Sequence, residues 1–337
     1  MQQTRFSAGG VGLVEAEPRA LRDGWVRLAV EACGICGSDL HMMRGYAPVP
    51  DWLVPGHEIV GVPVDGPSGL AEARYAVEPR VWCGQCEFCE TGSRQLCVSG
   101  TLIGLGFNGG LAETVDVPLA SLHRVPGDTE ALPASLSEPV AVCVRAMNLA
   151  RIDSDSRVLV LGGGTIGLLS GLLSRDRAQS VAITARHPQQ QEAAKRLGLL
   201  PLSEGEVDAW AASHGPDVVI ETVGGLADTL DDAMRFCRPG GRIVVLGVFA
   251  GSRPINALVF FIKELTLIGS NTYGTQRGSE FPSEFAEGVE LAARYRNEIA
   301  PLQTHQFELE SVADAFSCAD DKSSGAIKVT IVPRPGR

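Results

Sequence analysis

A buried-strand pattern that runs directly into a glycine-rich turn constrains how the middle of this chain can fold. The apolar run Val158 to Leu161 is followed by Gly162, Gly164 and Gly167 in the spacing GxGxxG, and then by an amphipathic pattern. A strand, a tight turn and a helix in this order bind a pyrophosphate, because the free N–H groups of the helix start point at it. Gly162 permits the turn, Gly164 allows close approach of the ligand, and Gly167 lets the helix pack on the sheet. The alternative is a glycine turn that binds nothing.

Strand and helix patterns alternate around and after this turn. We expect strands at Val158–Leu161, Val181–Thr184, Val218–Glu221, Ile243–Leu246 and Leu265–Ile268. We expect helices at Pro139–Ala150, Ile166–Ser174, Gln189–Leu197 and Leu226–Phe236. This alternation is typical of an α/β domain with a doubly wound parallel sheet, a Rossmann domain, which we place at residues 139–271.

The rest of the chain predicts a mostly β domain. Residues 1–138 contain short alternating runs broken by glycine and proline, such as Trp25–Val30 and Glu58–Val64, which are typical of strands. Residues 272–337 are too few for a domain, so we expect them to return and complete the first one. The expected elements of this tail are helices near Pro282–Tyr295 and Ser311–Ala319 and a strand at Ala326–Val332.

The end of the second expected strand indicates which dinucleotide binds. Sites for NAD usually carry Asp or Glu there, to bind the ribose 2′-hydroxyl. Here Ala185 and Arg186 follow the strand instead, and a guanidinium suits a 2′-phosphate. We therefore expect NADP(H) to be preferred over NAD(H), with a solvated loop arginine as the alternative. The other expected cofactor contacts are Thr165, Ile166, Gly247, Val248 and Phe249.

Four closely spaced cysteines predict a structural zinc site. Cys83, Cys86, Cys89 and Cys97 form the pattern CxxCxxCx7C, and zinc takes four thiolates in a tetrahedron. Disulfide bonding is the alternative. The chain has nine cysteines, and an odd count with one cluster is typical of a reducing compartment with metal sites, so we expect a cytoplasmic protein.

A second group of metal-ligating residues lies nearer the N-terminus. Cys33 and Cys36 form a CxxC that precedes Asp39 and His41, and His57 and Glu58 follow in Gly-His-Glu. A redox dithiol needs a strand–helix–strand context, which is absent around this CxxC. A single histidine would more often be a core residue than a metal ligand, but here it has neighbours that can share an ion.

These motifs in this order resemble the zinc-dependent medium-chain dehydrogenases/reductases, the alcohol dehydrogenase family. The sorbitol and threonine dehydrogenase branch is most similar, and the segment after GGGTIG also resembles NADP-dependent secondary alcohol dehydrogenases. The resemblance implies a GroES-like catalytic domain and a Rossmann domain. It assigns Cys36, His57 and Glu138 as ligands of a catalytic zinc, with Glu58 adjacent to the metal or bound to it, and the four-cysteine lobe at 83–97 as a structural zinc site.

The resemblance also implies the chemistry. It assigns Ser38 and His41 to a proton relay and Asp39 to the support of the catalytic histidine. The implied reaction transfers a hydride between an alcohol (a secondary alcohol, polyol or amino alcohol) and NADP or NAD, giving a ketone or aldehyde. Two zinc ions per chain and a homodimer or homotetramer are also implied.

Three other functions stay open at this point. A zinc-free reductase of the same superfamily would not keep Cys36, His57 and Glu138 together. A non-enzymatic NADP(H)-binding sensor would not need Ser38 and His41. A zinc-ribbon interaction module would not need the nucleotide domain.

Charge and hydropathy exclude further classes. The formal net charge is −11, which argues against a nucleic-acid or anionic-membrane partner, because either needs a basic face. No apolar run reaches the ~18 residues of a membrane span, and the first ten residues lack a signal-peptide pattern. We therefore expect a small-molecule substrate.

Overall fold

The computed structural model divides into two compact units. It describes residues 1–7, 10–46, 48–275 and 279–333; the remaining residues, which belong to the expected first and last segments of the chain, lie outside this description. The discontinuous unit comprises Met1–Glu138 and Gly274–Arg337, and the continuous unit comprises Pro139–Tyr273.

The continuous unit is built on a six-stranded sheet in which every pairing is parallel. The strand order is β12-β11-β10-β13-β14-β15, so the direction of winding reverses between β10 and β13. Its strands are β10 (Arg157–Leu161), β11 (Ser180–Thr184), β12 (Leu200–Leu202), β13 (Val218–Glu221), β14 (Arg242–Val245) and β15 (Thr266–Gly269). This order is that of a Rossmann sheet, which confirms the predicted fold class.

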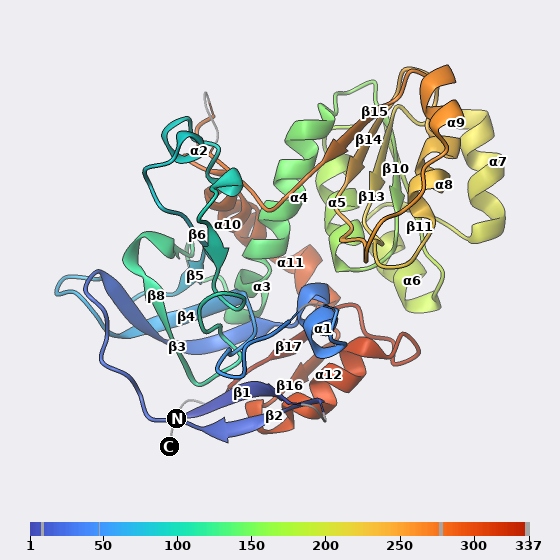
Figure 1. Cartoon of the computed structure of the whole chain (residues 1–337). Helices are drawn as coiled ribbons and strands as arrows, with labels where there is room; N and C mark the ends of the chain where they lie inside the picture. The colour runs from blue at the N-terminus through green and yellow to red at the C-terminus, as the bar shows by residue number, and fades with distance from the viewer. Residues whose placement is uncertain (8–9, 47, 276–278, 334–337) are drawn as a thin grey trace. The chain divides into compact units, whose positions relative to one another are not determined.

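Helices cover both faces of this sheet, with α4 and α5 on one side and α8 on the other (Figure 1). They are α4 (Ser137–Ala150), which starts in the discontinuous unit, α5 (Thr165–Arg175), α6 (Pro188–Arg196), α7 (Glu204–His214), α8 (Thr229–Phe236) and α9 (Ala257–Ile262). The strands are continuous apolar runs because both faces are buried: Leu159, Val219 and Ile243 have no exposed surface. The sequence prediction missed β12, α7 and α9.

The discontinuous unit contains a mixed sheet of seven strands. Their order is β16-β17-β3-β4-β5-β9, with β8 paired to β3. The strands are β3 (Trp25–Gly34), β4 (Glu58–Asp65), β5 (Tyr75–Val77), β8 (Thr114–Pro118), β9 (Leu122–Arg124), β16 (His305–Phe307) and β17 (Val329–Ile331). The C-terminal strand β17 lies antiparallel to β3, so the two ends of the chain build one sheet.

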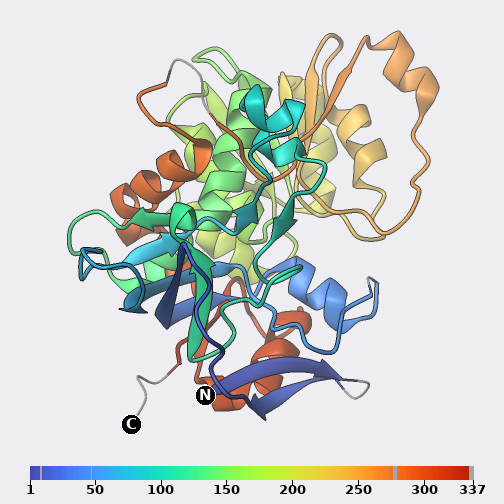
Figure 2. The ribbon, with the colours of Figure 1, turned by 60° about the vertical axis from the view of Figure 1, so that its left-hand side comes forward.

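Shorter elements complete this unit. They are the strand pairs β1 (Gln2–Ser7) with β2 (Gly10–Glu15) and β6 (Arg80–Val81) with β7 (Thr101–Leu102), and the helices α1 (Gly37–Met43), α2 (Glu87–Glu90), α3 (Ala131–Ser135), α10 (Glu284–Arg294), α11 (Arg296–Ile299) and α12 (Val312–Asp320). The β1–β2 hairpin lies against α12, where the Phe6 and Phe316 rings are 5.8 Å apart (Figure 2). Within the described residues, no helix is both long and apolar enough to cross a membrane.

Candidate active site

The candidate ligands of the catalytic zinc gather where β3 leads into α1 and where β4 begins. Cys36 is the N-cap residue of α1, and Glu58 is the first residue of β4. One ligand atom from each of Cys36, His57 and Glu58 lies within 4.8 Å of the others. The sequence places these residues some twenty positions apart, and the fold brings them to one point.

The buried Asp39 carboxylate holds this geometry. One oxygen accepts a hydrogen bond from the Cys36 backbone N–H at 2.8 Å, and the other accepts one from Gly56 N–H at 3.2 Å. Asp39 therefore ties the start of α1 to the residue before His57. Its oxygen is 4.0 Å from His57 Nδ1, which is too long for a hydrogen bond, so it supports the histidine chiefly through the backbone.

The electrostatics of His57 fit a cation site. Burial alone would lower the pKa of the imidazole, but the hydrogen-bonded Cys36 thiol, then Asp39 and Glu138, raise this pKa well above its usual value. Among the described residues, the buried Nδ1 of His57 has no hydrogen-bond partner. A thiol, an imidazole and carboxylates around one point are the donor set of zinc, so the residues present fit that ion.

Glu58 has a second partner. Its carboxylate oxygens lie 2.6 and 2.5 Å from the ammonium of Lys328, which also donates to the Ile35 carbonyl at 3.0 Å. A side chain at Gly34 would place its Cβ 2.0 Å from this carboxylate. Glu58 is therefore held in a fixed position by charge and by shape.

Glu138 stands slightly apart from the other three residues. It is buried in the first turn of α4, and it is close enough to His57 to raise that pKa. Its carboxylate is not in the group whose ligand atoms lie within 4.8 Å of one another. The structure thus brings Cys36, His57 and Glu58 together most closely, with Glu138 beside them.

Helix α1 presents two more candidate residues. The hydroxyl of Ser38 is buried, and within the described residues it has no hydrogen-bond partner, which leaves it available to a bound hydroxyl group. His41 lies one turn further along α1, on the same side of the helix. Burial, and then the positive charge of Arg44, lower the pKa of His41, so it is neutral at pH 7 and can accept a proton.

The four-cysteine lobe has the dimensions of a zinc site. The sulfurs of Cys83, Cys86, Cys89 and Cys97 lie 3.5 to 3.9 Å apart along four of their pairs. Four sulfurs at about 2.3 Å from one ion in a tetrahedron would be about 3.8 Å apart. All four cysteines are free, so the disulfide alternative fails. Backbone hydrogen bonds, first from the Cys89 N–H, lower the pKa of Cys86 to about 6, which favours the thiolate that a metal needs.

Cys33, by contrast, has the features of a core thiol. It has no exposed surface and forms no disulfide with Cys36. Burial raises its pKa well above the usual value, so the thiol stays protonated and unreactive. The two cysteines of the CxxC therefore have different roles: Cys36 is a candidate metal ligand, and Cys33 packs in the core.

The glycine loop follows β10 in the continuous unit. Gly162 has φ +109°, and its N–H donates to Thr184 Oγ at 2.8 Å, which joins the ends of β10 and β11. A Cβ on Gly167 would meet the Gly162 carbonyl at 1.8 Å, so only glycine lets α5 start this close to the strand. Gly164 is the N-cap residue, and space is open around it, as a ligand approaching Thr165 and Ile166 requires.

The other expected cofactor contacts lie at the same edge of the sheet. Ala185 and Arg186 follow β11; Ala185 is buried, while Arg186 is exposed and paired with Glu204 at 2.6 Å. Gly247, Val248 and Phe249 follow β14, and Gly225 N–H donates to the Val248 carbonyl at 2.8 Å. Ligands of doubly wound sheets bind at these carboxyl ends.

Comparison with known proteins identifies the family. The alcohol dehydrogenase GroES-like domain matches residues 22–127, and the zinc-binding dehydrogenase domain matches residues 165–294. The chain is 30% identical over 307 residues to the L-galactonate-5-dehydrogenase of Escherichia coli K12, with 87% of each chain covered. The chain belongs to the zinc-binding medium-chain dehydrogenase family.

Two further relatives of the dehydrogenase support this conclusion. The 2-dehydro-3-deoxy-L-galactonate 5-dehydrogenase of Pseudoalteromonas atlantica is 28% identical over 327 residues, with 93% of each chain covered. A solved zinc-binding dehydrogenase of Sinorhizobium meliloti 1021, bound to NADP, is 28% identical with a TM-score of 0.89, covering 98% of this chain and 99% of that one. These comparisons confirm the predicted family, the GroES-like and Rossmann domains, and an enzyme of the alcohol dehydrogenase type. The cofactors of this enzyme are zinc and a nicotinamide dinucleotide.

Sequence reasoning missed Lys328, and it placed Glu221 only as the last residue of a strand at the ligand-binding edge. Lys328 neutralises Glu58, and a single lysine within the apolar run Ala326–Val332 was the available signal. Glu221 is fully buried at the end of β13, and it accepts hydrogen bonds from the N–H groups of Val223 and Gly224. It therefore shapes the loop beside the nucleotide-binding edge.

Proposed function

We propose that the dehydrogenase reversibly oxidises a secondary alcohol group of a polyol or sugar acid, transferring the hydride to a nicotinamide dinucleotide. The observation that carries this proposal is the Cys36–His57–Glu58 group two residues from the buried hydroxyl of Ser38, which has no hydrogen-bond partner among the residues that the structure describes. The relatives named for L-galactonate support a polyol-like substrate, as does a sorbitol dehydrogenase of Halalkalibacterium halodurans that is 27% identical over 328 residues. Amino alcohols are the second class, because an L-threonine 3-dehydrogenase of Streptomyces avermitilis is 28% identical over 337 residues.

The protein's own groups bind the substrate and move its proton. Cys36, His57 and a carboxylate from Glu138 or Glu58 would hold the catalytic zinc, which when bound lowers the pKa of a hydroxyl and polarises a carbonyl. Ser38 Oγ accepts the proton of the substrate hydroxyl as it gives up its own, and His41 is the final acceptor, which releases a proton to solvent. Lys328 holds Glu58 in place, since the ammonium contacts both carboxylate oxygens.

We infer a preference for NADP(H) over NAD(H). The end of β11 carries no carboxylate for a ribose 2′-hydroxyl, and the exposed Arg186 guanidinium can bind a 2′-phosphate once it leaves Glu204. The Sinorhizobium meliloti structure contains NADP, whereas an alcohol dehydrogenase of E. coli CFT073 that is 25% identical contains NADH. Relatives of both kinds exist, so this chain's own residues carry the inference.

We also propose a homo-oligomer that forms through the continuous unit. Helix α9 exposes three large apolar side chains: Leu258 is 66% exposed, Phe261 77% and Ile262 66%. The neighbouring strand β15 is the last of its sheet. A second copy that covers this face would bury the apolar surface and extend the sheet edge. Light scattering of wild type and Phe261→Glu tests this: a dimer or tetramer that becomes a folded monomer supports it, and a wild-type monomer contradicts it.

Metal content and turnover together test the main proposal. Wild type should contain two zinc ions per chain. Cys36→Ala should contain one zinc ion and should show no turnover. Cys89→Ala should also contain one zinc ion, and its thermal stability should be lower than that of wild type. Cys318→Ala is the matched control, since Cys318 lies in neither group, and it should keep both ions and full turnover. Turnover of a panel of polyols, sugar acids and amino alcohols with each dinucleotide identifies the substrate class. Full activity of the zinc-depleted Cys36→Ala variant would refute the proposed chemistry.

The free state of all nine cysteines supports a reducing, cytoplasmic location.

A further inference from the structure

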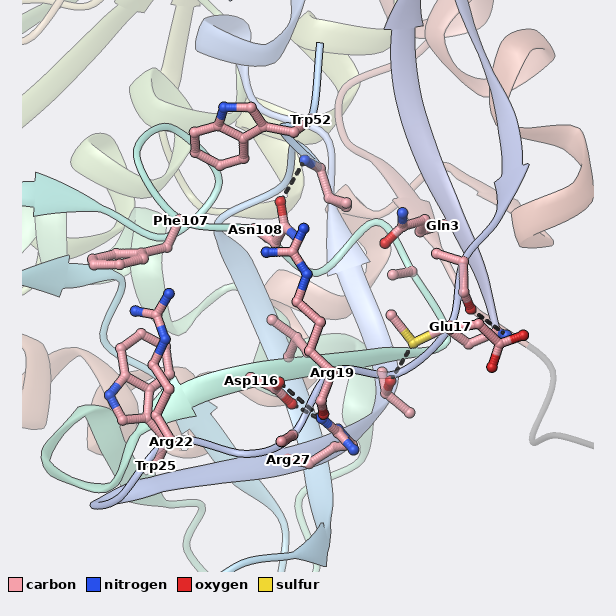
Figure 3. A pocket seen from close by; sticks show the side chains of 18 of the residues that line it. Gln3, Glu17, Arg19, Arg22, Trp25, Arg27, Trp52, Phe107, Asn108 and Asp116 are labelled. Carbon is pink, nitrogen blue, oxygen red and sulfur yellow. Dashed lines mark hydrogen bonds and ion pairs between the residues drawn. The ribbon is translucent and has the colours of Figure 1, made fainter. Parts of the chain in front are cut away.

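A cavity of about 660 Å³ lies wholly within the discontinuous unit, and none of the candidate metal ligands lines it. Its walls come from β1, residues 16–22, β3, β8 and the loop at residues 106–109 (Figure 3). Small-molecule sites typically have volumes of about 300–1,000 Å³, so the cavity is large enough for a ligand.

The cavity is positively charged although the chain is acidic. Four arginines line it (Arg5, Arg19, Arg22 and Arg27), against the two carboxylates of Glu17 and Asp116. Arg27 is paired with Asp116 through hydrogen bonds of 2.7 and 2.9 Å. In the described part of the chain, Arg5, Arg19 and Arg22 form no ion pair. An acidic protein therefore places unneutralised guanidinium groups around one hollow.

Two of these guanidinium groups repel each other. Burial, and then the nearby charge of Arg19, lower the pKa of Arg5, although both groups stay charged at neutral pH. In Figure 3, Arg19 lies in the middle of the view, between the aromatic side chains and Gln3 with Glu17. An anion bound here would remove this repulsion, and arginine forks match carboxylate and phosphate oxygens.

Aromatic rings form one side of the cavity. The Trp25 and Phe107 rings contact each other edge to face, with centres 5.2 Å apart. The Arg22 guanidinium lies against both, 5.0 Å from the ring centre of Trp25 and 5.6 Å from that of Phe107 (Figure 3). Trp52 also lines the cavity and is 48% exposed. Such surfaces favour a flat apolar group, which stacks on a ring while the guanidinium binds a charged end.

We propose that this cavity is a second ligand site, which takes a small organic anion with a flat apolar part and a carboxylate or phosphate group. The site does not depend on the proposed reaction. Its wall is joined to the metal centre, because Gly109 N–H donates to the Val54 carbonyl at 2.7 Å and Gly110 N–H to the Gly56 carbonyl at 2.9 Å. A ligand here therefore contacts the segment that leads to His57.

Calorimetric titration with 1-naphthyl phosphate tests the site in the zinc-loaded enzyme, with NADP and NAD present in excess to fill the nucleotide site. Wild type should bind this probe at least about 10-fold more tightly than inorganic phosphate or 1-naphthol, which each lack one of the two features. The double variant Arg19→Ala/Arg22→Ala should weaken binding of 1-naphthyl phosphate by about 10-fold or more. Because both arginine side chains are exposed, their removal should leave the fold intact.

A second variant and a control make the result specific. Trp52→Ala should lower the affinity for 1-naphthyl phosphate several-fold. The affinity for inorganic phosphate, which is already lower in wild type, should stay unchanged. Arg196→Ala removes an exposed arginine on α6, outside the cavity, and should change neither affinity. Equal affinity for 1-naphthyl phosphate in wild type and in both cavity variants would overturn the proposal, as would the absence of binding at millimolar concentration.

Discussion

The ammonium of Lys328 lies 2.5 and 2.6 Å from the two oxygens of the Glu58 carboxylate, although 270 positions separate the two residues in the sequence. Both side chains are almost completely buried, at 4% and 2% exposure. Burial of either charge alone is costly, and a paired arrangement offsets this cost only while both partners are present. The pair thus fixes a carboxylate next to the imidazole and thiol of the candidate metal site.

Removal of Lys328 should destabilise the protein strongly. Lys328→Met leaves the Glu58 carboxylate buried without a counter-charge, which costs about 3–5 kcal/mol in the free energy of unfolding. The double variant Lys328→Met/Glu58→Gln should recover much of this loss, because it removes the orphaned charge. Lys322→Met, on the exposed surface, should change stability by less than about 0.5 kcal/mol. Urea denaturation measures all three, and equal effects of the two lysine variants would contradict the role of the pair.

The proposed proton relay predicts a pH shift when a neighbour of His41 is changed. The Arg44 charge contributes, after burial, to the lowered pKa of His41. Arg44→Ala removes a charge that disfavours the imidazolium, so the pKa of His41 rises and the acid limb of kcat/KM for alcohol oxidation moves to higher pH. Asp320→Asn should move it the other way, because Asp320 pairs with Arg44 and partly neutralises it. A limb that stays in place in both variants would assign the titration to another group.

Nucleotide preference should depend on Arg186. If this side chain binds the 2′-phosphate, Arg186→Ala loses about 1.5–3 kcal/mol of charge-assisted hydrogen bonding, which is a loss of about 10- to 150-fold in kcat/KM for NADP. The value for NAD should change less than about 2-fold. Glu204→Gln, which frees Arg186 from its ion pair, should raise kcat/KM for NADP. An equal loss with both dinucleotides after Arg186→Ala would remove the 2′-phosphate role.

The continuous unit should lose stability in acid through Asp217. Burial alone would raise the pKa of this carboxyl, but hydrogen bonds from Arg157 and Arg238 lower it to about 2. Because the folded pKa is below the unfolded value, this stabilisation is present above about pH 4 and is lost as the pH falls toward 2. With solvent screening it contributes about 1 kcal/mol at pH 7. The stability difference between wild type and Asp217→Asn, measured by urea denaturation from pH 7 to pH 3, should therefore shrink with acidification.

The parts of the fold that the sequence predicted best are buried on both faces. The strand Val218–Glu221 was predicted to the residue, because three consecutive β-branched apolar residues just before a turn allow few other structures. Helix α9 was missed because its short apolar run Ala257–Ile262 lacks helical periodicity. The contact between Glu58 and Lys328 could not be read from either local segment, since it depends on β17 pairing with β3. The carboxylate ligand also depends on how the chain folds: the family pattern favours Glu138, while the fold places Glu58 closer to Cys36 and His57.

The C-terminal return sets an order of assembly on the ribosome. The continuous unit is complete once Tyr273 has been synthesised, but the sheet whose strands lead to Cys36 and His57 lacks β16 and β17 until Ile331 is added. A nascent chain that stops before Lys328 leaves β3 with an open edge and Glu58 with no cation. Products of translation truncated before Lys328 therefore present incomplete sheets, which we expect quality-control proteases to degrade.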